Sequence, residues 1–416
     1  MANDNWSRLD NVAKLFLATI TKRDTKTLRV SCILKEDIRP DLLQEALMSA
    51  IQDRPQMQVR IRRGLFWHYM ESTDIMPEVT EECDRICPLL YSPAKSMLHY
   101  KVTYFNNRIN LDIFHALTDG TGALEFLNII VLDYLRLCYP GEFDNVTIHS
   151  GASENDLGQD SYRQFFGSMG LNPGGSSKKA YHPGSLKYPF DQLRFFEIHM
   201  PSDQVLTKAK KIGVSLTSYM GACWMMAIRD EMPPRRRNVP VTMTLPVNLR
   251  NYYPSYTARN FFNNVTVTHV FSGPVTVEEL AKEFDASLKS QLTEENIKKQ
   301  MDGFETMEYV APVRAVPLVI KQLVVRHVKK VSDKKVSMVF SNLGVLKPPA
   351  EVAEKIGNYS TFCSSSHMFS TMSAFNKDLT LGVSTPYQNT GVIKNLVRSL
   401  VSDGVDIRVY ATEVIG

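Results

Sequence analysis

The most informative segment of the chain is INLDIFHALTDGTGALEFL, residues 109–127. Its first part alternates apolar side chains at a period of two, which is typical of a β-strand, and the row that begins at Ile109 continues to His115. From Thr121 onward the apolar spacing is helical. The stretch therefore predicts an inward-facing histidine at the end of a strand, followed by a tight turn and a helix. An imidazole held by rigid elements on both sides can accept a proton near neutral pH.

The residues after the histidine allow two interpretations. In the first, His115 is a hydrogen-bonded core residue, Asp119 caps the next helix and Gly120 supplies an unusual backbone angle. In the second, the three residues form a functional site. The pattern H-x-x-x-D-G is more restrictive than a lone histidine, but six residues alone leave both interpretations open.

Strands and helices alternate on both sides of this stretch. Before it, apolar spacing and turn residues predict helices over 12–20 and 39–55, a strand over 27–36, a hairpin that turns at Gly64 and two strands within 98–115. After it, the same patterns predict strands over 193–200, 239–249, 263–271, 336–344 and 379–385, helices over 215–230, 276–300 and 315–330, and a further helix with Ser202 as its N-cap.

The chain divides into two parts. Between about 150 and 188 the composition shifts to Gly, Ser, Asn, Pro and Lys, which bury little apolar surface and suit a linker or crossover. A chain of 416 residues is also too long for one ordinary core. We therefore expect two subdomains of mixed α and β structure, residues 1–175 and 176–416.

The overall composition excludes several classes of protein. With 44% hydrophobic and 22% charged residues it is typical of a soluble globular chain, and a net charge of +4 does not indicate nucleic-acid binding. No export signal or spanning segment is evident, so we expect a cytoplasmic location. Among the six cysteines, Cys83 and Cys87 form one close pair without the spacing of a zinc site. We expect reduced thiols and no metal.

The segment from His115 to Gly120 resembles the H-x-x-x-D-G motif of the CoA-dependent acyltransferase superfamily. This superfamily includes chloramphenicol acetyltransferase, plant acyltransferases that act on alcohols, and the condensation domains of nonribosomal peptide synthetases. Residues 245–264 and 340–344 resemble second-half signatures of microbial alcohol acetyltransferase-like proteins. Phe114 stands where condensation domains usually carry a second histidine, and the D-F-G-W-G segment of the plant enzymes is absent.

The resemblance implies a fold and a set of roles. The fold is α/β, with two chloramphenicol acetyltransferase-like α+β subdomains, each a two-layer sandwich, and a tunnel between them. His115 stands in the tunnel as the general base, and Asp119 and Gly120 are structural. Asp119 pairs with an arginine of the second half, for which Arg250 is the candidate; the alternative is a solvent-facing Arg250 at a strand end.

The oxyanion of the intermediate needs a hydrogen-bond donor. Ser341 and Asn342 are the candidates at the position that the resemblance indicates, and a turn-forming role for them is equally open. Asn248 and Asn260 are weaker candidates.

Coenzyme A carries three phosphate groups, so basic residues near the tunnel mouth are expected. The stretches 233–238 and 320–335 are basic, and Lys329 and Lys330 of the second are the candidates for CoA contact. The alternative for both stretches is a solvated loop or helix face.

The function implied is acyl transfer, most simply of an acetyl group, from acyl-CoA to a small-molecule alcohol or amine. The attack is direct and needs neither a bound cofactor nor a metal. A donor carried by an acyl-carrier protein and a noncatalytic protein that only binds a ligand in the tunnel are the alternatives.

Overall fold

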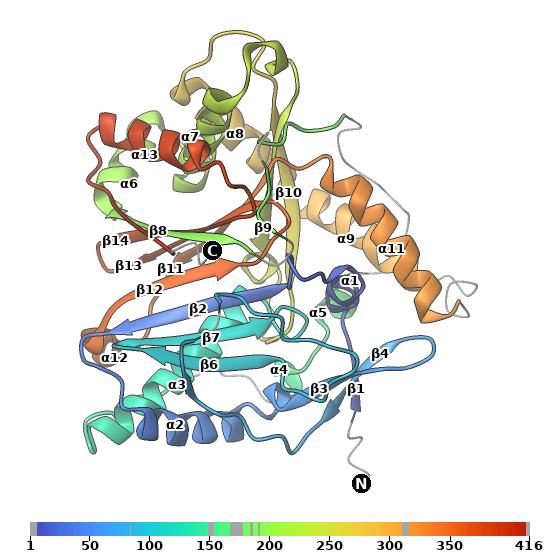
Figure 1. Cartoon of the computed structure of the whole chain (residues 1–416), viewed down its shortest axis with the longest axis vertical. Coiled ribbons are helices and arrows are strands. Elements are labelled where there is room, and N and C mark those ends of the chain that lie inside the picture. The colour runs from blue at the N-terminus through green and yellow to red at the C-terminus, as the bar shows by residue number, and fades with distance from the viewer. Residues whose placement is uncertain are drawn as a thin grey trace.

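A computed structural model of the chain describes residues 6–83, 85–148, 154–166, 178–183, 186–189, 192–309 and 316–412. Within these ranges the strands form three sheets, and the two larger sheets lie one above the other in the view of Figure 1. Across the same ranges, the helices are too short or too polar to cross a bilayer.

The first sheet has five strands in the order β12, β2, β7, β6 and β5. Their bounds are Ile356–Cys363, Thr27–Leu34, Arg108–Phe114, Tyr100–Phe105 and Thr80–Glu81. Helices α2 (Pro40–Asp53) and α3 (Gly120–Cys138) cover its outer face (Figure 1). Alternate residues of β7, among them Ile109 and Ile113, are fully buried in the core that these helices complete.

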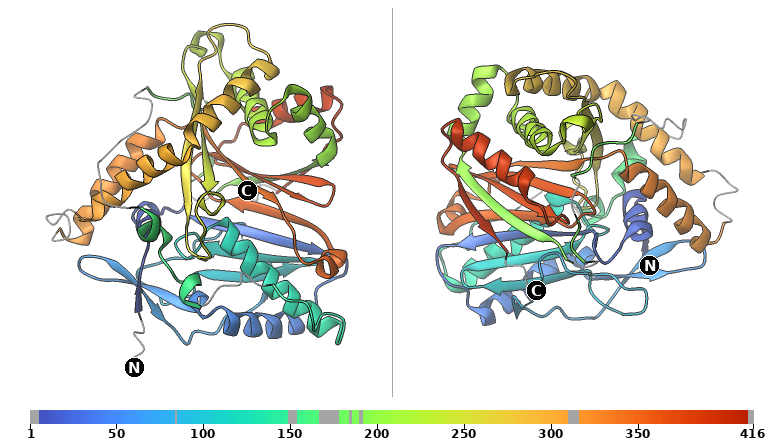
Figure 2. Two further views of the ribbon diagram at one scale, coloured as in Figure 1. Left: turned by 180° about the vertical axis from the view of Figure 1, so that it is seen from behind. Right: turned by 45° about the horizontal axis from the view of Figure 1, so that its top comes forward.

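The second sheet has seven strands in the order β10, β9, β11, β13, β14, β8 and β15. Their bounds are Phe262–His269, Val241–Asn248, Met338–Val345, Met368–Phe375, Asp378–Thr385, Arg194–Pro201 and Arg408–Ala411. Its outer face is covered by the helices that Figure 2 shows from two sides, namely α6 (Ser202–Ile212), α7 (Leu216–Glu231), α8 (Val277–Gln291) and α13 (Gly391–Ser402). The two-subdomain α/β class predicted from the sequence is confirmed.

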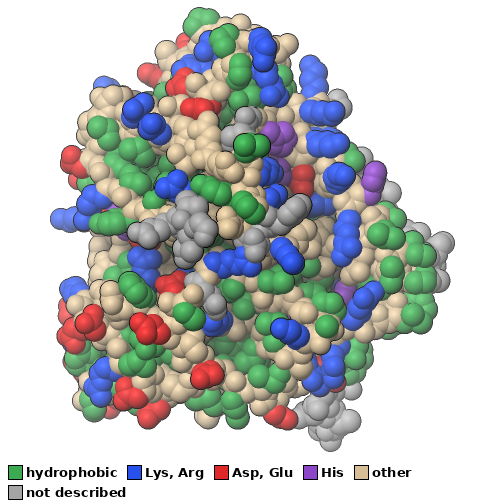
Figure 3. Space-filling view, viewed as in Figure 1, with side chains coloured by type: hydrophobic (Ala, Val, Ile, Leu, Met, Phe, Trp, Pro, Cys, Tyr) green, Lys and Arg blue, Asp and Glu red, His purple; other side chains and the backbone are tan. Residues whose placement is uncertain are grey.

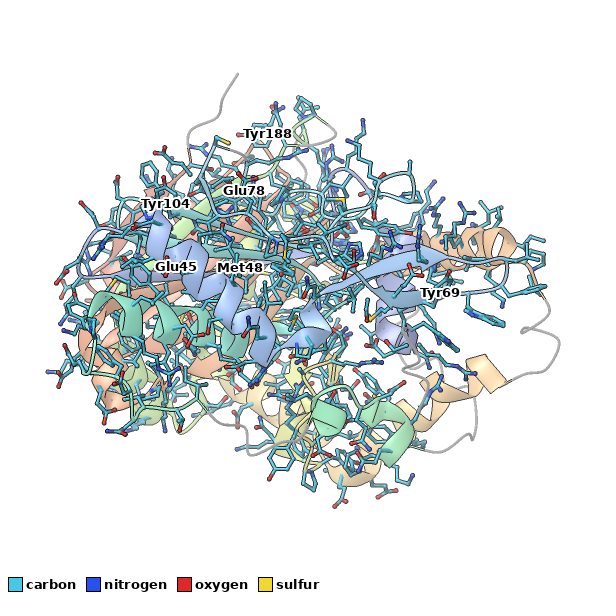
Figure 4. The ribbon with its side chains drawn as sticks, turned by 90° about the horizontal axis from the view of Figure 1, so that it is seen from below. Glu45, Met48, Tyr69, Glu78, Tyr104 and Tyr188 are labelled. Atoms are coloured by element: carbon cyan, nitrogen blue, oxygen red, sulfur yellow. The ribbon has the colours of Figure 1, made fainter. Side chains whose placement is uncertain are left out.

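The third sheet is a small ribbon at one side of the molecule. It contains β1 (Trp6–Arg8), β4 (His68–Ser72) and β3 (Val59–Arg63). Figure 4 shows Tyr69 on this ribbon, well away from Glu45 and Met48 of α2. The remaining elements are η1 (Pro55–Met57), η2 (Pro234–Arg236), η3 (Leu249–Asn251), α1 (Asn11–Thr19), α4 (Glu154–Leu157), α5 (Ser161–Phe165), α9 (Glu294–Tyr309), α11 (Leu318–Asp333) and α12 (Ala350–Lys355).

Strand β12 connects the two halves of the sequence. It comes late in the chain but pairs antiparallel with β2, with Tyr359 opposite Cys32. Its other neighbours are β13 and β14 of the second sheet, where a Cβ on Gly382 would lie 1.8 Å from the carbonyl oxygen of Thr361. The division into 1–175 and 176–416 therefore does not hold for β12, because the second part contributes this strand to the first sheet.

Part of the segment interpreted as a linker is packed. Helices α4 and α5 lie within it, and Tyr162 and Phe166 are buried in a small aromatic cluster with Phe261. The average composition of the segment is polar, so the packing of these two aromatic residues was not predicted. Its Gly- and Ser-rich residues 167–177 lie outside the described residues.

Other predicted elements are shifted or were missed. Ser202 is the first residue of α6 and Pro201 takes the N-cap position, so the predicted cap is wrong. The helix expected over 276–300 is two helices, α8 and α9. Strand β12, helix α13 and strand β15 were not predicted. All six cysteines are free thiols.

A polar network joins the two large sheets. His199 of β8 lies between two carboxylates, with Nε2 2.8 Å from Glu197 Oε1 and Nδ1 2.7 Å from Asp378 Oδ2. Arg108 of the first sheet donates to Glu197, and a cavity of about 860 Å³ opens beside the network. Burial by itself would lower the pKa of His199, but the hydrogen bonds to Asp378 and Glu197 outweigh it and raise the pKa to about 9.

Replacement of His199 by glutamine is expected to destabilise the protein in a pH-dependent way. The folded-state pKa of His199 lies above its ordinary value of 6.5, so the stabilisation is fully present below about pH 6.5 and is lost as the pH rises through about 9. The difference in free energy of unfolding between wild type and H199Q should be on the order of 3 kcal/mol at low pH and should shrink toward about pH 10. Urea unfolding across this range measures it, and a difference that does not change with pH would contradict the assigned charge.

Candidate active site

His115 is the first residue after β7, which ends at Phe114. Its backbone N–H donates to the carbonyl oxygen of Lys26 at 2.8 Å, which keeps the chain beside β2. The imidazole is partly exposed and packs between Phe16 of α1 and Phe262 of β10, with ring centroids 4.7 and 5.8 Å away. The predicted position at a strand end is therefore correct, and the ring lies where the first half of the chain meets the second.

Asn260 holds His115 by two hydrogen bonds. The backbone carbonyl oxygen of His115 can only accept, so Nδ2 of Asn260 must face it, at 2.9 Å. Oδ1 of Asn260 then faces Nδ1 of the imidazole, at 3.0 Å. Because an amide oxygen only accepts, Nδ1 must carry the hydrogen in the neutral ring, and the lone pair is on Nε2.

The environment keeps the imidazole uncharged. Burial lowers the pKa of His115, and the carboxylate of Asp119 and the hydrogen bond that the imidazole donates to Asn260 offset this only in part. Two aromatic neighbours, Phe16 and Phe262, supply part of that burial. The ring is thus neutral around pH 7 and able to accept a proton.

Asp119 both caps a helix and pairs with Arg250, the two roles that the sequence left open. Its Oδ1 accepts from the backbone N–H groups of Thr121 and Gly122 at 3.1 and 3.2 Å, so it caps α3. Its Oδ2 accepts from Arg250 Nη1 at 2.7 Å and from the backbone N–H of Phe261 at 3.0 Å. Only 8% of the Asp119 side chain and 13% of the Arg250 side chain are exposed.

Arg250 connects the motif to the segment that carries Asn260. Its Nη2 donates to the carbonyl oxygens of Thr257 and Arg259 at 2.8 and 2.7 Å. The alternative of a solvent-facing Arg250 therefore does not apply. Because Asn260 directly follows Arg259, the ion pair of Arg250 with Asp119 also positions the residue that holds His115.

Gly120 and Gly122 allow close packing at the start of α3. A Cβ on Gly120 would lie 2.8 Å from Cδ2 of Leu343, and one on Gly122 would lie 2.7 Å from the carbonyl oxygen of Ala258. The φ angle of Gly120 is not positive, so the unusual backbone angle considered from the sequence is not present. Close approach of neighbouring segments explains both glycines instead.

The two oxyanion candidates differ in their contacts. Nδ2 of Asn342 donates to Oγ1 of Thr217 at 2.8 Å, and its Oδ1 accepts from the backbone N–H of Gly344 at 2.8 Å. Asn342 thus makes the turn contact that was the alternative to the oxyanion role, and one of the two N–H donors of its amide is bound to Thr217. Ser341 is partly buried. It lies two residues before Leu343, whose side chain packs against Gly120 of the motif.

The weaker asparagine candidates also donate hydrogen bonds to neighbouring protein groups. Asn248 donates to Oγ1 of Thr121 at 3.2 Å and caps η3 by accepting from the backbone N–H of Arg250. Asn260 donates to His115, so its position in the site was foreseen but its role was not. The contact between His115 and Phe16 was missed, because nothing in the sequence near α1 marks it.

The two lysines proposed for CoA contact lie on α11. Lys329 forms an ion pair with Asp333 at 2.5 Å, and Lys330 is exposed. Helix α11 packs against α1, the helix whose Phe16 contacts His115. The cavity beside His199 is separate from His115, because it opens at Arg108, about 23 Å from His115 along β7.

No family model and no curated protein matches this chain in sequence. Solved structures match it in fold. TRI101 of Fusarium sporotrichioides, complexed with coenzyme A and T-2, gives a TM-score of 0.66 at 9% identity over 97% of this chain and 99% of that chain. This chain has the fold of the CoA-dependent acyltransferases. TRI3 trichothecene 15-O-acetyltransferase from the same species gives 0.60 at 12% identity over 95% of this chain and 94% of that one.

The acyltransferase fold extends to peptide synthetases. The epimerization domain from the third module of tyrocidine synthetase B gives a TM-score of 0.58 at 11% identity over 95% of this chain and 94% of that chain. This chain therefore shares its architecture with acetyltransferases and with condensation-type domains.

Proposed function

We propose that this protein transfers an acyl group from acyl-CoA to a hydroxyl or amine acceptor, with His115 as the general base. The observation that carries the proposal is the pair of hydrogen bonds between Asn260 and His115. Asn260 donates to the backbone carbonyl oxygen of His115 and accepts from Nδ1–H of the neutral imidazole, so Nε2 is left able to accept a proton. Asp119 and Arg250 then have structural roles, because they hold the segment that carries Asn260.

In the proposed reaction Nε2 of His115 takes the proton of the acceptor as the acceptor attacks the thioester carbonyl carbon. The tetrahedral intermediate places a negative charge on the former carbonyl oxygen, for which Ser341 is the proposed donor. Collapse of the intermediate breaks the C–S bond. The protonated His115 then returns its proton to the departing CoA thiolate, so no covalent enzyme intermediate is needed.

Two proteins of the same fold support these substrate classes. TRI101 has been crystallised with coenzyme A and T-2, and TRI3 is an O-acetyltransferase. Transfer of an acetyl group to an alcohol is therefore the first reaction to test. Release of free thiol from a panel of acyl-CoA donors, in the presence of alcohols and amines, would identify both substrates.

A carrier-protein donor is the second candidate, because the chain shares its fold with the epimerization domain of tyrocidine synthetase B. A comparison of turnover with the two kinds of acyl donor distinguishes the two candidate functions. Turnover of acetyl-CoA alone supports the first, whereas turnover only with an acylated carrier protein supports the second. Ligand binding without turnover of either donor would favour a noncatalytic role.

Asn260 gives a prediction specific to this site. Asn260→Ala removes the hydrogen bond that fixes the tautomer, and we expect kcat/KM to fall about 10- to 100-fold, as for the loss of one or two buried hydrogen bonds. Asn260→Asp places a carboxylate beside the ring, which favours the imidazolium and raises the pKa of His115. The acid limb of the pH–rate profile should therefore move to higher pH in N260D. An unchanged profile in folded N260D would assign Asn260 a purely structural role.

A further inference from the structure

Helix α11 and the tip of the β3–β4 ribbon carry an unusual concentration of exposed apolar side chains. We call this surface the α11 flank and define it by residues that are 45% to 71% exposed: Leu65, Trp67, Val319, Ile320, Leu323, Val324, Val328 and Val331. Only Leu318 of α11 is buried, so this helix turns most of its apolar residues away from the core. Exposed apolar groups at this density mark an interaction surface.

The two parts of the flank are continuous. The backbone N–H of Leu318 donates to the carbonyl oxygen of Leu65 at 2.9 Å, and Nζ of Lys321 donates to the carbonyl oxygen of Phe66 at 3.3 Å. The ribbon tip is thereby tied to the first turn of α11. Figure 4 shows the ribbon that carries Tyr69 extending to the same side of the molecule as α11.

The charge around the flank is strongly positive. Residues 318–335 contain the cations Lys321, Arg326, Lys329, Lys330, Lys334 and Lys335 and a single acidic residue, Asp333. Figure 3 shows Lys and Arg side chains along this side of the molecule, with hydrophobic side chains at its outer edge. A second copy of the chain would present the same positive charge, so a symmetric contact through this surface would be opposed by repulsion.

We propose that the α11 flank binds the headgroup region of an anionic lipid bilayer. An apolar helix face bordered by Lys and Arg is suited to lie in the plane of a membrane surface, where its apolar side chains enter the headgroup boundary and its cations meet lipid phosphates. Trp67 at the ribbon tip is suited to the headgroup region of the bilayer, where tryptophan side chains are enriched. With 16 residues, α11 lies along such a surface and does not cross the bilayer.

The position of α11 relates this surface to the candidate active site. Nε of Arg326 donates to the carbonyl oxygen of Ala18 in α1 at 2.8 Å, and Phe16 of the same helix contacts His115. Two helices, α11 and α1, would therefore separate a bilayer on the flank from the imidazole. Membrane binding does not depend on the proposed acyl transfer and is tested without an activity assay.

Sedimentation with lipid vesicles tests the proposal on the full chain. Wild type should pellet with vesicles that contain phosphatidylglycerol and much less with phosphatidylcholine alone, and high salt should weaken the binding. The double variant L323D/V328D should lose at least tenfold in partition coefficient. V401D is the matched control, because Val401 is 51% exposed on α13, and it should bind as wild type does.

A second variant tests the electrostatic part. Lys330→Ala removes one exposed cation and should lower the partition coefficient on anionic vesicles about fivefold at low salt, with little effect on neutral ones. Circular dichroism and thermal unfolding confirm that each variant is folded. Failure of wild type to pellet with anionic vesicles would overturn the proposal. So would a concentration-dependent dimer that L323D/V328D abolishes, since it would assign the flank to a second copy of the chain.

Discussion

His115→Ala is expected to lower kcat/KM for acyl transfer by about 10²–10⁴-fold, because general-base assistance typically contributes that much to the rate. The imidazole is neutral and partly exposed, and its removal leaves one hydrogen-bonding atom of Asn260 without its partner. A loss of about 1–3 kcal/mol in stability therefore accompanies the loss of activity without unfolding the protein. Thiol release from acyl-CoA measures the activity, and circular dichroism measures the folding.

His327→Ala is the matched control for the loss of a histidine. His327 lies on α11 with its side chain exposed, so its replacement should leave both activity and stability unchanged. Wild-type activity in purified, folded H115A would refute the role of His115 as the base. Equal losses in H115A and H327A would instead point to an effect on the preparation and not on the site.

Asp119→Ala is expected to lower the free energy of unfolding by about 3–5 kcal/mol, because it leaves the guanidinium of Arg250 without its charge partner in a largely buried position. Loss of the cap on α3 adds about 1 kcal/mol. Activity should fall as well, because Arg250 positions the segment that carries Asn260. Urea unfolding followed by circular dichroism gives the change in stability.

Two further variants separate charge from capping. Asp119→Asn keeps an acceptor for the helix N-terminus and removes the charge, so its loss of stability should be intermediate. The double variant D119A/R250A should lose less than the sum of the two single changes, since it leaves no unpaired charge. The exposed pair of Lys282 and Glu278 provides the reference, and Glu278→Ala should cost no more than about 0.5 kcal/mol. A similarly small effect of D119A would show that the buried pair does not stabilise the fold.

The site could be predicted from the sequence to different degrees. His115, Asp119 and Gly120 follow one another within a strand, a turn and a helix, so local pattern was sufficient to find them. Arg250 was predicted as a strand-end arginine in a stretch that resembles known acyltransferases. In the structure its Nη1 lies 2.7 Å from Oδ2 of Asp119, as expected. The hydrogen bond that Asn342 donates to Thr217 could not be predicted, because Thr217 lies on a helix far away in the sequence.

Elements that depend on neighbouring residues could be predicted from the order of the amino acids. Apolar periodicity located β2, β7, α2 and α3, because burial of one face is a local requirement of each strand and helix. The H-x-x-x-D-G pattern likewise identified the turn after β7, since the cap, the glycines and the imidazole lie within eight residues of one another.

The contacts between distant segments are known only from the folded chain. It placed β12 in the first sheet, brought Asn260 to the imidazole of His115 and left the apolar residues of α11 exposed. Each of these outcomes depends on long-range contacts, and a helical apolar stripe looks the same whether a core or the surroundings cover it. The free energy that selects such contacts comes from surfaces that are adjacent only in the folded chain, so no local pattern records it.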